Sequence, residues 1–378
     1  MSQDEKNDIE MKVEEDEFFS INKLKGIFTK YLKDHTVYET IPENMKILVF
    51  NSELMIKDSI EAMIKEDIYC GLLWDSNANK YIGIFTIRDV LSLIMISYQQ
   101  LNQYLNSNTN INDLDTLIKS IVEIFSKMTF DKNKMDLEEE EKIDTTNYDK
   151  IIKNFSDFFK LFDNFTINDY VNKFKDKEQN MISIYLDGNL QDCIKLIRDN
   201  HIHRIVVEDQ KSNTITGFIT YEAIFEFFIE NYYSSMKEFE IKLKDVNIIS
   251  KNVFSLKKDD NLCKAMELFC SKKISLIPIM DDKEILGYIY LKDIIYCFSN
   301  GNNLNFNTKI SAFLEDLYEG VDNEKPYGKK RITQLDETTD LKKVFEEMSI
   351  CPERKLVVKY EDHIGIITLS NIFTELVD

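Results

Sequence analysis

Two carboxylates of this sequence stand where they could cap a helix and accept hydrogen bonds from a ligand. Asp89 and Asp293 each come three residues after a hydroxyl-bearing residue and directly before an apolar pair. That order predicts a strand that runs into a helix, with the carboxylate capping the helix N-terminus. Because backbone N–H groups are unpaired there, the position favours anions, and a carboxylate can accept two hydrogen bonds from ribose hydroxyls. A plain helix cap is the alternative interpretation.

A second group of residues is suited to phosphate. Thr86 lies three residues before Asp89, and Thr368 holds the same place before Asn371, so both hydroxyls can meet a phosphate oxygen. In the string His201-Ile202-His203-Arg204, the arginine offers a fork of donors that suits phosphate, and the histidine before it adds a donor that responds to pH. A basic surface pair at a helix end is the alternative.

These residues belong to a segment that recurs four times along the chain. Each copy begins with glycine, continues through apolar residues, carries a hydroxyl residue three places on and ends three places further with Asp, Ala or Asn. The copies are GIFTIRD (83–89), GFITYEA (217–223), GYIYLKD (287–293) and GIITLSN (365–371). Each copy predicts a turn, a strand and the start of a helix.

A helix and a further strand are predicted upstream of each copy. The strands are CGLLW (70–74), IVVE (205–208), LIPIM (276–280) and KLVVK (355–359). Before each strand, apolar residues recur with the period of a helix, as at Leu190, Cys193, Ile194 and Ile197. A module of this size cannot bury both of its faces alone. We therefore expect an α/β fold in which repeat 1 packs on repeat 2 and repeat 3 packs on repeat 4.

The repeats divide the chain into seven parts. The predicted parts are an acidic leader (1–34), repeat 1 (35–102), an acidic insertion with helices (103–180), repeat 2 (181–245), repeat 3 (246–300), a linker (301–330) and repeat 4 (331–378). The leader carries a helical pattern around residues 24–32. The insertion contains a charge-rich stretch, 131–150, that is typical of a solvated loop.

The composition argues against several classes of function. The 378 residues carry a formal net charge of −20, which disfavours nucleic acid and anionic membranes as partners. No apolar run could cross a bilayer and no signal-peptide pattern opens the sequence, so we expect a cytoplasmic protein, with the nucleus as a second location. Six cysteines without a CxxC spacing predict buried thiols rather than metal ligands. Without a known catalytic motif, neither an enzyme nor a catalytic cofactor is expected.

The repeat resembles the CBS module, named for cystathionine β-synthase, two copies of which pair into a Bateman domain. Four copies in one chain are similar to the gamma subunit of AMP-activated protein kinase, as are several stretches of sequence. These stretches are HTVYETIP (35–42), KILVFNSEL (46–54), LLWDSNANKYIGIFTIRDV (72–90) and RDNHIHRIVVED (198–209). The resemblance covers roughly residues 30–102 and 165–378. It implies four CBS repeats in two Bateman domains, arranged as a disc.

The resemblance also assigns roles to individual residues, without any metal site. Ribose contacts are implied at Asp89 and Asp293. Together with the pattern above, phosphate contacts are implied at Thr86, His203, Arg204, Ser275 and Arg354. Further candidates are Lys273, Thr368, Ser370 and Asn371.

The implied function is that of a regulatory subunit that binds AMP, ADP or ATP and assembles with a catalytic kinase subunit and a beta-type scaffold subunit. Several residues depart from the family, which has Arg, Lys, His and Asp where this chain has Tyr69, Glu222, Glu353 and Asn371. A glutamate in place of a phosphate-facing lysine turns attraction into repulsion. Two alternatives therefore remain: a gamma-like scaffold that has lost nucleotide sensing, and a CBS protein for another adenosyl ligand such as S-adenosylmethionine.

Overall fold

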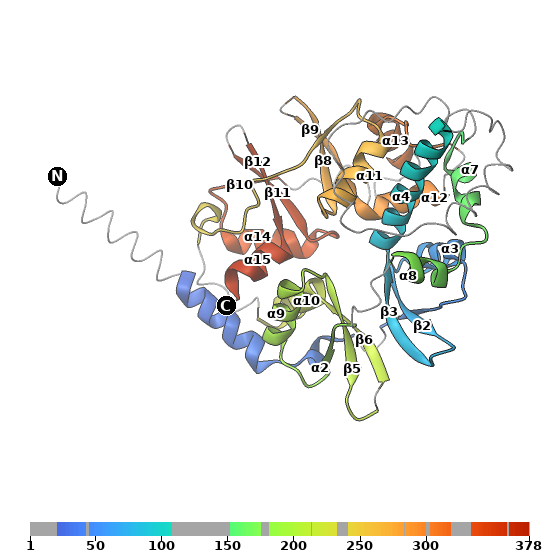
Figure 1. Ribbon diagram of the computed structural model, residues 1–378. Helices are drawn as coiled ribbons and strands as arrows, with labels where there is room; N and C mark the ends of the chain where they lie inside the picture. The colour runs from blue at the N-terminus through green and yellow to red at the C-terminus, as the bar shows by residue number, and fades with distance from the viewer. Residues whose placement is uncertain are drawn as a thin grey trace. The chain divides into compact units, whose positions relative to one another are not determined.

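The computed structural model describes ten stretches of the chain. They are residues 21–42, 45–107, 152–174, 181–212, 214–232, 241–282, 284–299, 303–318, 334–360 and 363–377. The charge-rich stretch 131–150 lies outside them. The chain divides into two units: unit 1 holds repeats 2 and 4, and unit 2 holds repeats 1 and 3 (Figure 1).

Each repeat consists of a three-stranded sheet with one helix after its first strand and another after its third. Repeat 1 comprises β1 (Leu48–Asn51), α3 (Ile56–Glu66), β2 (Cys70–Asp75), β3 (Lys80–Thr86) and α4 (Ile87–Ser107). Repeat 2 comprises β4 (Ser183–Tyr185), α9 (Leu190–Asp199), β5 (Arg204–Asp209), β6 (Thr214–Thr220) and α10 (Tyr221–Tyr232). Repeat 3 comprises β7 (Leu256–Lys257), α11 (Leu262–Ser271), β8 (Leu276–Asp281), β9 (Glu284–Tyr290), η5 (Leu291–Ile295) and α12 (Tyr296–Ser299). Repeat 4 comprises β10 (Gln334–Asp336), α14 (Leu341–Ile350), β11 (Lys355–Tyr360), β12 (His363–Thr368) and α15 (Leu369–Leu376). The predicted order of helix, strand, strand and helix is confirmed in all four.

The first strand of each repeat is the element that the sequence did not predict. It spans two to four residues and pairs in parallel with the second strand, which in turn forms an antiparallel hairpin with the third. A run this short cannot display the alternation of apolar and polar residues that identifies a strand. The parallel pairing becomes evident only when the intervening helix returns the chain to the same sheet.

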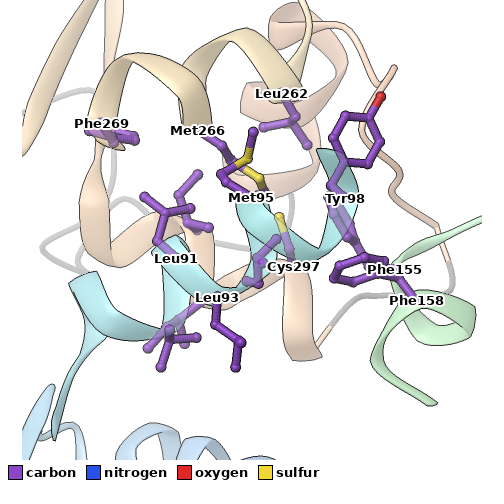
Figure 2. Close-up of a cluster of buried hydrophobic side chains, with 14 of the residues drawn as sticks. Leu91, Leu93, Met95, Tyr98, Phe155, Phe158, Leu262, Met266, Phe269 and Cys297 are labelled. Atoms are coloured by element: carbon purple, nitrogen blue, oxygen red, sulfur yellow. The ribbon is translucent and has the colours of Figure 1, made fainter. Parts of the chain in front are cut away.

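The core of unit 2 is a layer of helices from repeats 1 and 3. The first half of helix α4, residues 90–98, is largely apolar and buries residues on several sides, among them Leu91, Met95 and Tyr98. Figure 2 shows these side chains between those of α11 and those of α7 (Phe155–Phe159). The Tyr98 ring stacks on that of Phe306, with ring centroids 4.0 Å apart. Repeat 1 therefore buries its second helix against repeat 3.

Unit 1 is built in the same way from repeats 2 and 4. The helices α9, α10, α14 and α15 contribute to one buried cluster, which a helical stretch over residues 21–34 completes. Phe28, on that stretch, is fully buried and contacts the rings of Phe228, Phe345 and Phe373. The helical pattern predicted around residues 24–32 is thus confirmed, and this part of the leader belongs to the core.

Within each unit, the helices thus pack repeat 1 against repeat 3 and repeat 2 against repeat 4. The sequence did not predict this packing, and the predicted packing of repeat 1 on repeat 2 and of repeat 3 on repeat 4 stays a prediction. The periodicity identified which helix faces are apolar, but four similar faces can be matched in several ways. The choice depends on long-range shape complementarity, which a repeat pattern does not contain.

Repeats that are adjacent in the sequence are related in another way, through four accessory helices. These are α2 (Val37–Thr40), α8 (Ile167–Phe174), η4 (Leu243–Asp245) and α13 (Ile310–Tyr318). The residue directly before each accessory helix forms an isolated antiparallel bridge. Its bridge partner is the residue directly before the first helix of a repeat. The bridges are Thr36 with Asn189, Met55 with Thr166, Lys242 with Asp340 and Asn261 with Lys309.

These bridges exchange segments between neighbouring repeats. Helix α2 precedes repeat 1 in the chain but docks on repeat 2, whereas α8 precedes repeat 2 and docks on repeat 1. Repeats 3 and 4 exchange η4 and α13 in the same way. Residues 35–42, predicted as the opening of repeat 1, therefore lie with repeat 2, and residues 165–174 of the predicted insertion lie with repeat 1.

Two further observations concern thiols and membranes. All six cysteines are free; five are buried and Cys270 is partly buried, which confirms the predicted burial. Across the stretches that the structure covers, no helix is both long and apolar enough to cross a bilayer.

We expect Phe345→Ala to destabilise unit 1 by about 3–5 kcal/mol, since it removes a buried ring that joins two repeats to the leader helix. Ile350→Ala, on the same helix, removes a side chain that is 73% exposed and should cost less than about 0.5 kcal/mol. Urea unfolding followed by circular dichroism measures both. Equal losses in the two variants would contradict the core described here.

Candidate functional site

The second helix of repeat 1 begins with a capping box. The Oδ2 atom of Asp89 accepts the backbone N–H of Thr86 at 2.7 Å and its hydroxyl at 2.6 Å. The Thr86 hydroxyl oxygen in turn accepts the backbone N–H of Asp89 at 3.4 Å. The threonine is therefore the cap, and the carboxylate that the sequence predicted as the cap is the third residue of the helix.

Repeats 3 and 4 build their second helix on related pairs. In repeat 4, Asn371 Oδ1 accepts the backbone N–H and the hydroxyl of Thr368 at 3.0 and 2.8 Å, so a neutral amide makes the bonds that Asp89 makes. In repeat 3, the carboxylate of Asp293 accepts the backbone N–H of Tyr290 at 2.8 Å. Its side chain is only 5% exposed. Three of the four helix starts thus carry a side-chain acceptor.

Repeat 2 lacks that acceptor and has a cation nearby. The Thr220 hydroxyl accepts the backbone N–H of Ala223 at 3.2 Å, but alanine cannot return a bond. Arg204, the first residue of β5, pairs across the sheet with Thr220. Within the described ranges, no carboxylate forms an ion pair with the Arg204 guanidinium. A helix start without a carboxylate at its third position, beside a cation, favours an anion, although exposed Glu222 in the first turn of α10 opposes it.

The strand register aligns the four repeats and corrects one sequence assignment. The residues paired with the helix cap are Cys70, Arg204, Leu276 and Lys355 in repeats 1 to 4. Lys355, rather than Arg354, therefore holds the place of Arg204, and Arg354 holds that of His203. The sequence missed this shift because the turn differs. In repeat 4, the residue with a left-handed backbone in the turn before the second strand is Arg354, directly before that strand. In the other repeats the left-handed residue comes three positions before the strand begins, as His201 does before Arg204.

This alignment separates the charges by unit. The cations that face a helix cap, Arg204 and Lys355, are both in unit 1. The carboxylates at the third helical position, Asp89 and Asp293, are both in unit 2. Each pair of repeats that exchanges accessory helices consequently contains one such carboxylate and one such cation.

Arg354 has a structural role that the sequence did not predict. Its Nη1 atom donates to the carbonyl oxygens of Met348, at 3.0 Å, and Cys351, at 2.9 Å, and also to that of Ser349. Its Nη2 atom lies 2.6 Å from the Glu226 carboxylate of α10. The guanidinium thus caps the C-terminus of α14 and links repeat 4 to repeat 2, so it is not directed at a phosphate.

The remaining candidates lie at the edges of the repeats. His203 is exposed beside Arg204, and Ser275 is partly buried at the equivalent place in repeat 3. Lys273 is exposed, with a left-handed backbone at φ +52°. Ser370 is exposed and forms a hydrogen bond with Tyr221. The described ranges contain no cluster of side chains suited to a metal ion.

Two residues that the sequence did not single out contact this region. Arg88 donates to the carbonyl oxygens of Phe269 and Ile274 at 3.1 and 3.2 Å, which closes the end of α11, and burial lowers its pKa. Tyr170, on α8, donates its hydroxyl to Asp89 Oδ1 at 2.6 Å. A search for the Thr-x-x-Asp pattern would have found Thr166 and Asp169 at the start of α8. It would not have predicted the hydrogen bond between Tyr170 and Asp89.

Comparisons with known proteins agree with this arrangement. The family model described as "CBS domain" matches residues 175–230 and 243–300. The gamma subunit of 5'-AMP-activated protein kinase from Dictyostelium discoideum is 22% identical over 70% of this chain, and the human gamma-3 subunit is 19% identical over 93%. A Methanocaldococcus jannaschii structure, described as that of a proposed archaeal homologue of this subunit, matches 90% of the chain with a TM-score of 0.58 at 14% identity, and 99% of that chain is covered. The chain thus contains CBS domains and is similar to gamma subunits of AMP-activated protein kinase.

The likeness concerns only part of each curated relative. The matched part of this CBS protein spans 37% of the Dictyostelium subunit and 60% of the human subunit. The family model covers the second and third CBS repeats, whereas the structural match extends over almost the whole chain. Four CBS repeats in an α/β arrangement, as predicted, are therefore confirmed.

We expect Arg354→Ala to lower the stability of the CBS protein by about 1.5–3 kcal/mol, because several charge-assisted hydrogen bonds to the end of α14 are lost. Glu226→Gln removes only the partner in the exposed ion pair and should cost less than about 1 kcal/mol. Thermal unfolding of both variants provides the comparison. A role in phosphate binding would instead appear as a loss of nucleotide affinity at unchanged stability.

Proposed function

We propose that this chain is a non-catalytic regulatory subunit of an AMP-activated type of protein kinase complex and that it binds adenine nucleotides to report energy state. The similarity to named gamma subunits supports the general role. The chemistry of the repeats supports an anionic ligand, because a guanidinium and a helix N-terminus converge in repeat 2.

Arg204 is the residue that carries this proposal. It stands opposite Thr220 at the start of α10, where the residue equivalent to Asp89 is Ala223. The chain has a net charge of −20, yet the Arg204 guanidinium forms no ion pair with the described residues. Its positive charge is therefore available to an anionic ligand. A fork of N–H donors suits phosphate, and exposed His203 adds a second donor.

The proposed ribose contact is Asp293. Carboxylates accept diol hydroxyls, and the structurally equivalent Asn371 offers only an amide. Ser275 and Lys273, in the turn before β8, are proposed as further contacts to phosphate.

The first test measures AMP, ADP and ATP binding by isothermal titration calorimetry. Arg204→Ala should weaken AMP binding by roughly 1.5–3 kcal/mol, or about 10- to 150-fold in Kd, the usual range for a hydrogen bond to a charged group. Asp293→Ala should weaken it by a comparable amount.

The matched control is Lys211→Ala, which removes an exposed cation from the turn between β5 and β6, at the other end of the strand from Arg204. It should leave the affinity within about twofold. If S-adenosylmethionine binds and AMP, ADP and ATP do not, the ligand is another adenosyl compound. If none of them binds at millimolar concentration, nucleotide sensing is wrong.

A scaffold without sensing is the second candidate, and specific observations favour it. Glu222 is exposed at the start of α10, where it repels an anion, and Arg354 is engaged by the end of its own helix. A scaffold would bind kinase subunits with the same affinity in the presence and absence of nucleotide.

We expect the chain isolated from its own cells to co-purify with a serine/threonine kinase catalytic subunit and a beta-type scaffold subunit, because the curated relatives are named as subunits of such a kinase. Mass spectrometry of the purified complex tests this. Recovery of neither subunit would reject membership of the complex, and a complex whose kinase activity ignores AMP would favour the scaffold.

A further inference from the structure

The carboxylate of Asp89 is already occupied by donors from the chain. Thr86 supplies two donors to Oδ2, at 2.7 and 2.6 Å, and Tyr170 supplies one to Oδ1, at 2.6 Å. An ionised carboxylate accepts about four hydrogen bonds. A ribose diol brings two more donors, so both of its hydroxyls cannot bind Asp89 while Tyr170 is in place.

The position of Tyr170 is fixed by the way α8 docks on repeat 1. The backbone N–H of Ile167 donates to Leu54 at 2.9 Å, and that of Asn168 donates to Ser52 at 2.7 Å. Tyr170 is only 5% exposed. Its ring packs edge-to-face against that of Phe85, with ring centroids 5.4 Å apart and an interplanar angle of 72°. The hydroxyl therefore reaches Asp89 from a rigid element.

The phenol is a donor in this bond at every ordinary pH. Burial, followed by the negative charge of Asp89 and the hydrogen bond to it, raises the pKa of Tyr170 well above 10. A short O–H···O⁻ bond of this kind is among the stronger hydrogen bonds in proteins. A ligand that takes its place must offset both this bond and the removal of a buried ring.

The capping box itself does not require a tyrosine. Thr166 and Asp169 form the same box at the start of α8, with bonds of 2.9 and 2.7 Å to Asp169 Oδ2. Among the described residues no tyrosine hydroxyl reaches Asp169. The contact between Tyr170 and Asp89 is therefore an addition to helix capping, made by a segment that precedes repeat 2.

We propose that the hydroxyl of Tyr170 takes the place of a ligand's ribose hydroxyl on Asp89, so that repeat 1 is closed to nucleotides by the chain itself. This inference rests on the proposed nucleotide-binding function. Tyr170 thereby acts as a specificity-determining residue, because it limits the carboxylates that can receive a ribose.

The experiment compares AMP stoichiometry in the full-length wild type, Tyr170→Ala and the double variant Asp89→Asn/Tyr170→Ala by isothermal titration calorimetry. We expect Tyr170→Ala to bind one more AMP per chain than the wild type, and the double variant to lose that additional site. Asp169→Asn is the matched control, since it alters the same kind of box without a tyrosine, and it should add no site.

Tyr170→Phe removes the donor but keeps the ring against Phe85, so it replaces Tyr170→Ala if that variant does not fold. It too should acquire AMP binding that depends on Asp89. An unchanged stoichiometry in a folded Tyr170 variant overturns the inference. A tenfold or greater loss of AMP affinity in Asp89→Asn alone also overturns it, while the proposed function stands. If neither the wild type nor a Tyr170 variant binds AMP, ADP or ATP, the proposed function fails and the inference fails with it.

Discussion

The helices of each repeat have more apolar surface than their own small sheet can cover, and the rest of the structure follows from that constraint. A sheet of three strands, one of them only two to four residues long, covers one side of its helices. The opposite side of α4, with Leu91 and Met95, must therefore be buried against another repeat. Two arginines reinforce this pairing, since Arg88 reaches the end of α11 and Arg354 connects α14 with α10.

Helix starts are where stability and chemistry compete in this protein. The first backbone N–H groups of a helix need acceptors, and the same groups attract anionic ligands. Repeats 1, 3 and 4 satisfy the helix with Asp89, Asp293 and Asn371, whereas repeat 2 has Ala223 and a nearby guanidinium. The four repeated segments thus differ in charge at the start of their second helix. The strand register shows which residues of the four repeats are equivalent.

The sequence was sufficient to predict the repeats, their second and third strands, their helices and the burial of the cysteines, because these depend on periodicity within about twenty residues. It was insufficient for features that depend on contacts between distant segments. The pairing of repeats 1 and 3, the exchange of α2 and α8, and the approach of Tyr170 to Asp89 are of this kind. Arg354 was misassigned because two adjacent basic residues made the alignment ambiguous until the pairing of Lys355 with Thr368 resolved it.

The interleaving of repeats has a consequence for biosynthesis. Repeats 1 and 2 exchange accessory helices with each other, so the first part of the chain can complete these contacts as it leaves the ribosome. The partners of α4 and α10 belong to repeats 3 and 4, which are translated later. During that interval the apolar faces of both helices are exposed to water and to other nascent chains, a state that favours aggregation. We therefore expect the newly made first half to rely on chaperones, or on rapid completion of the second half, to remain soluble.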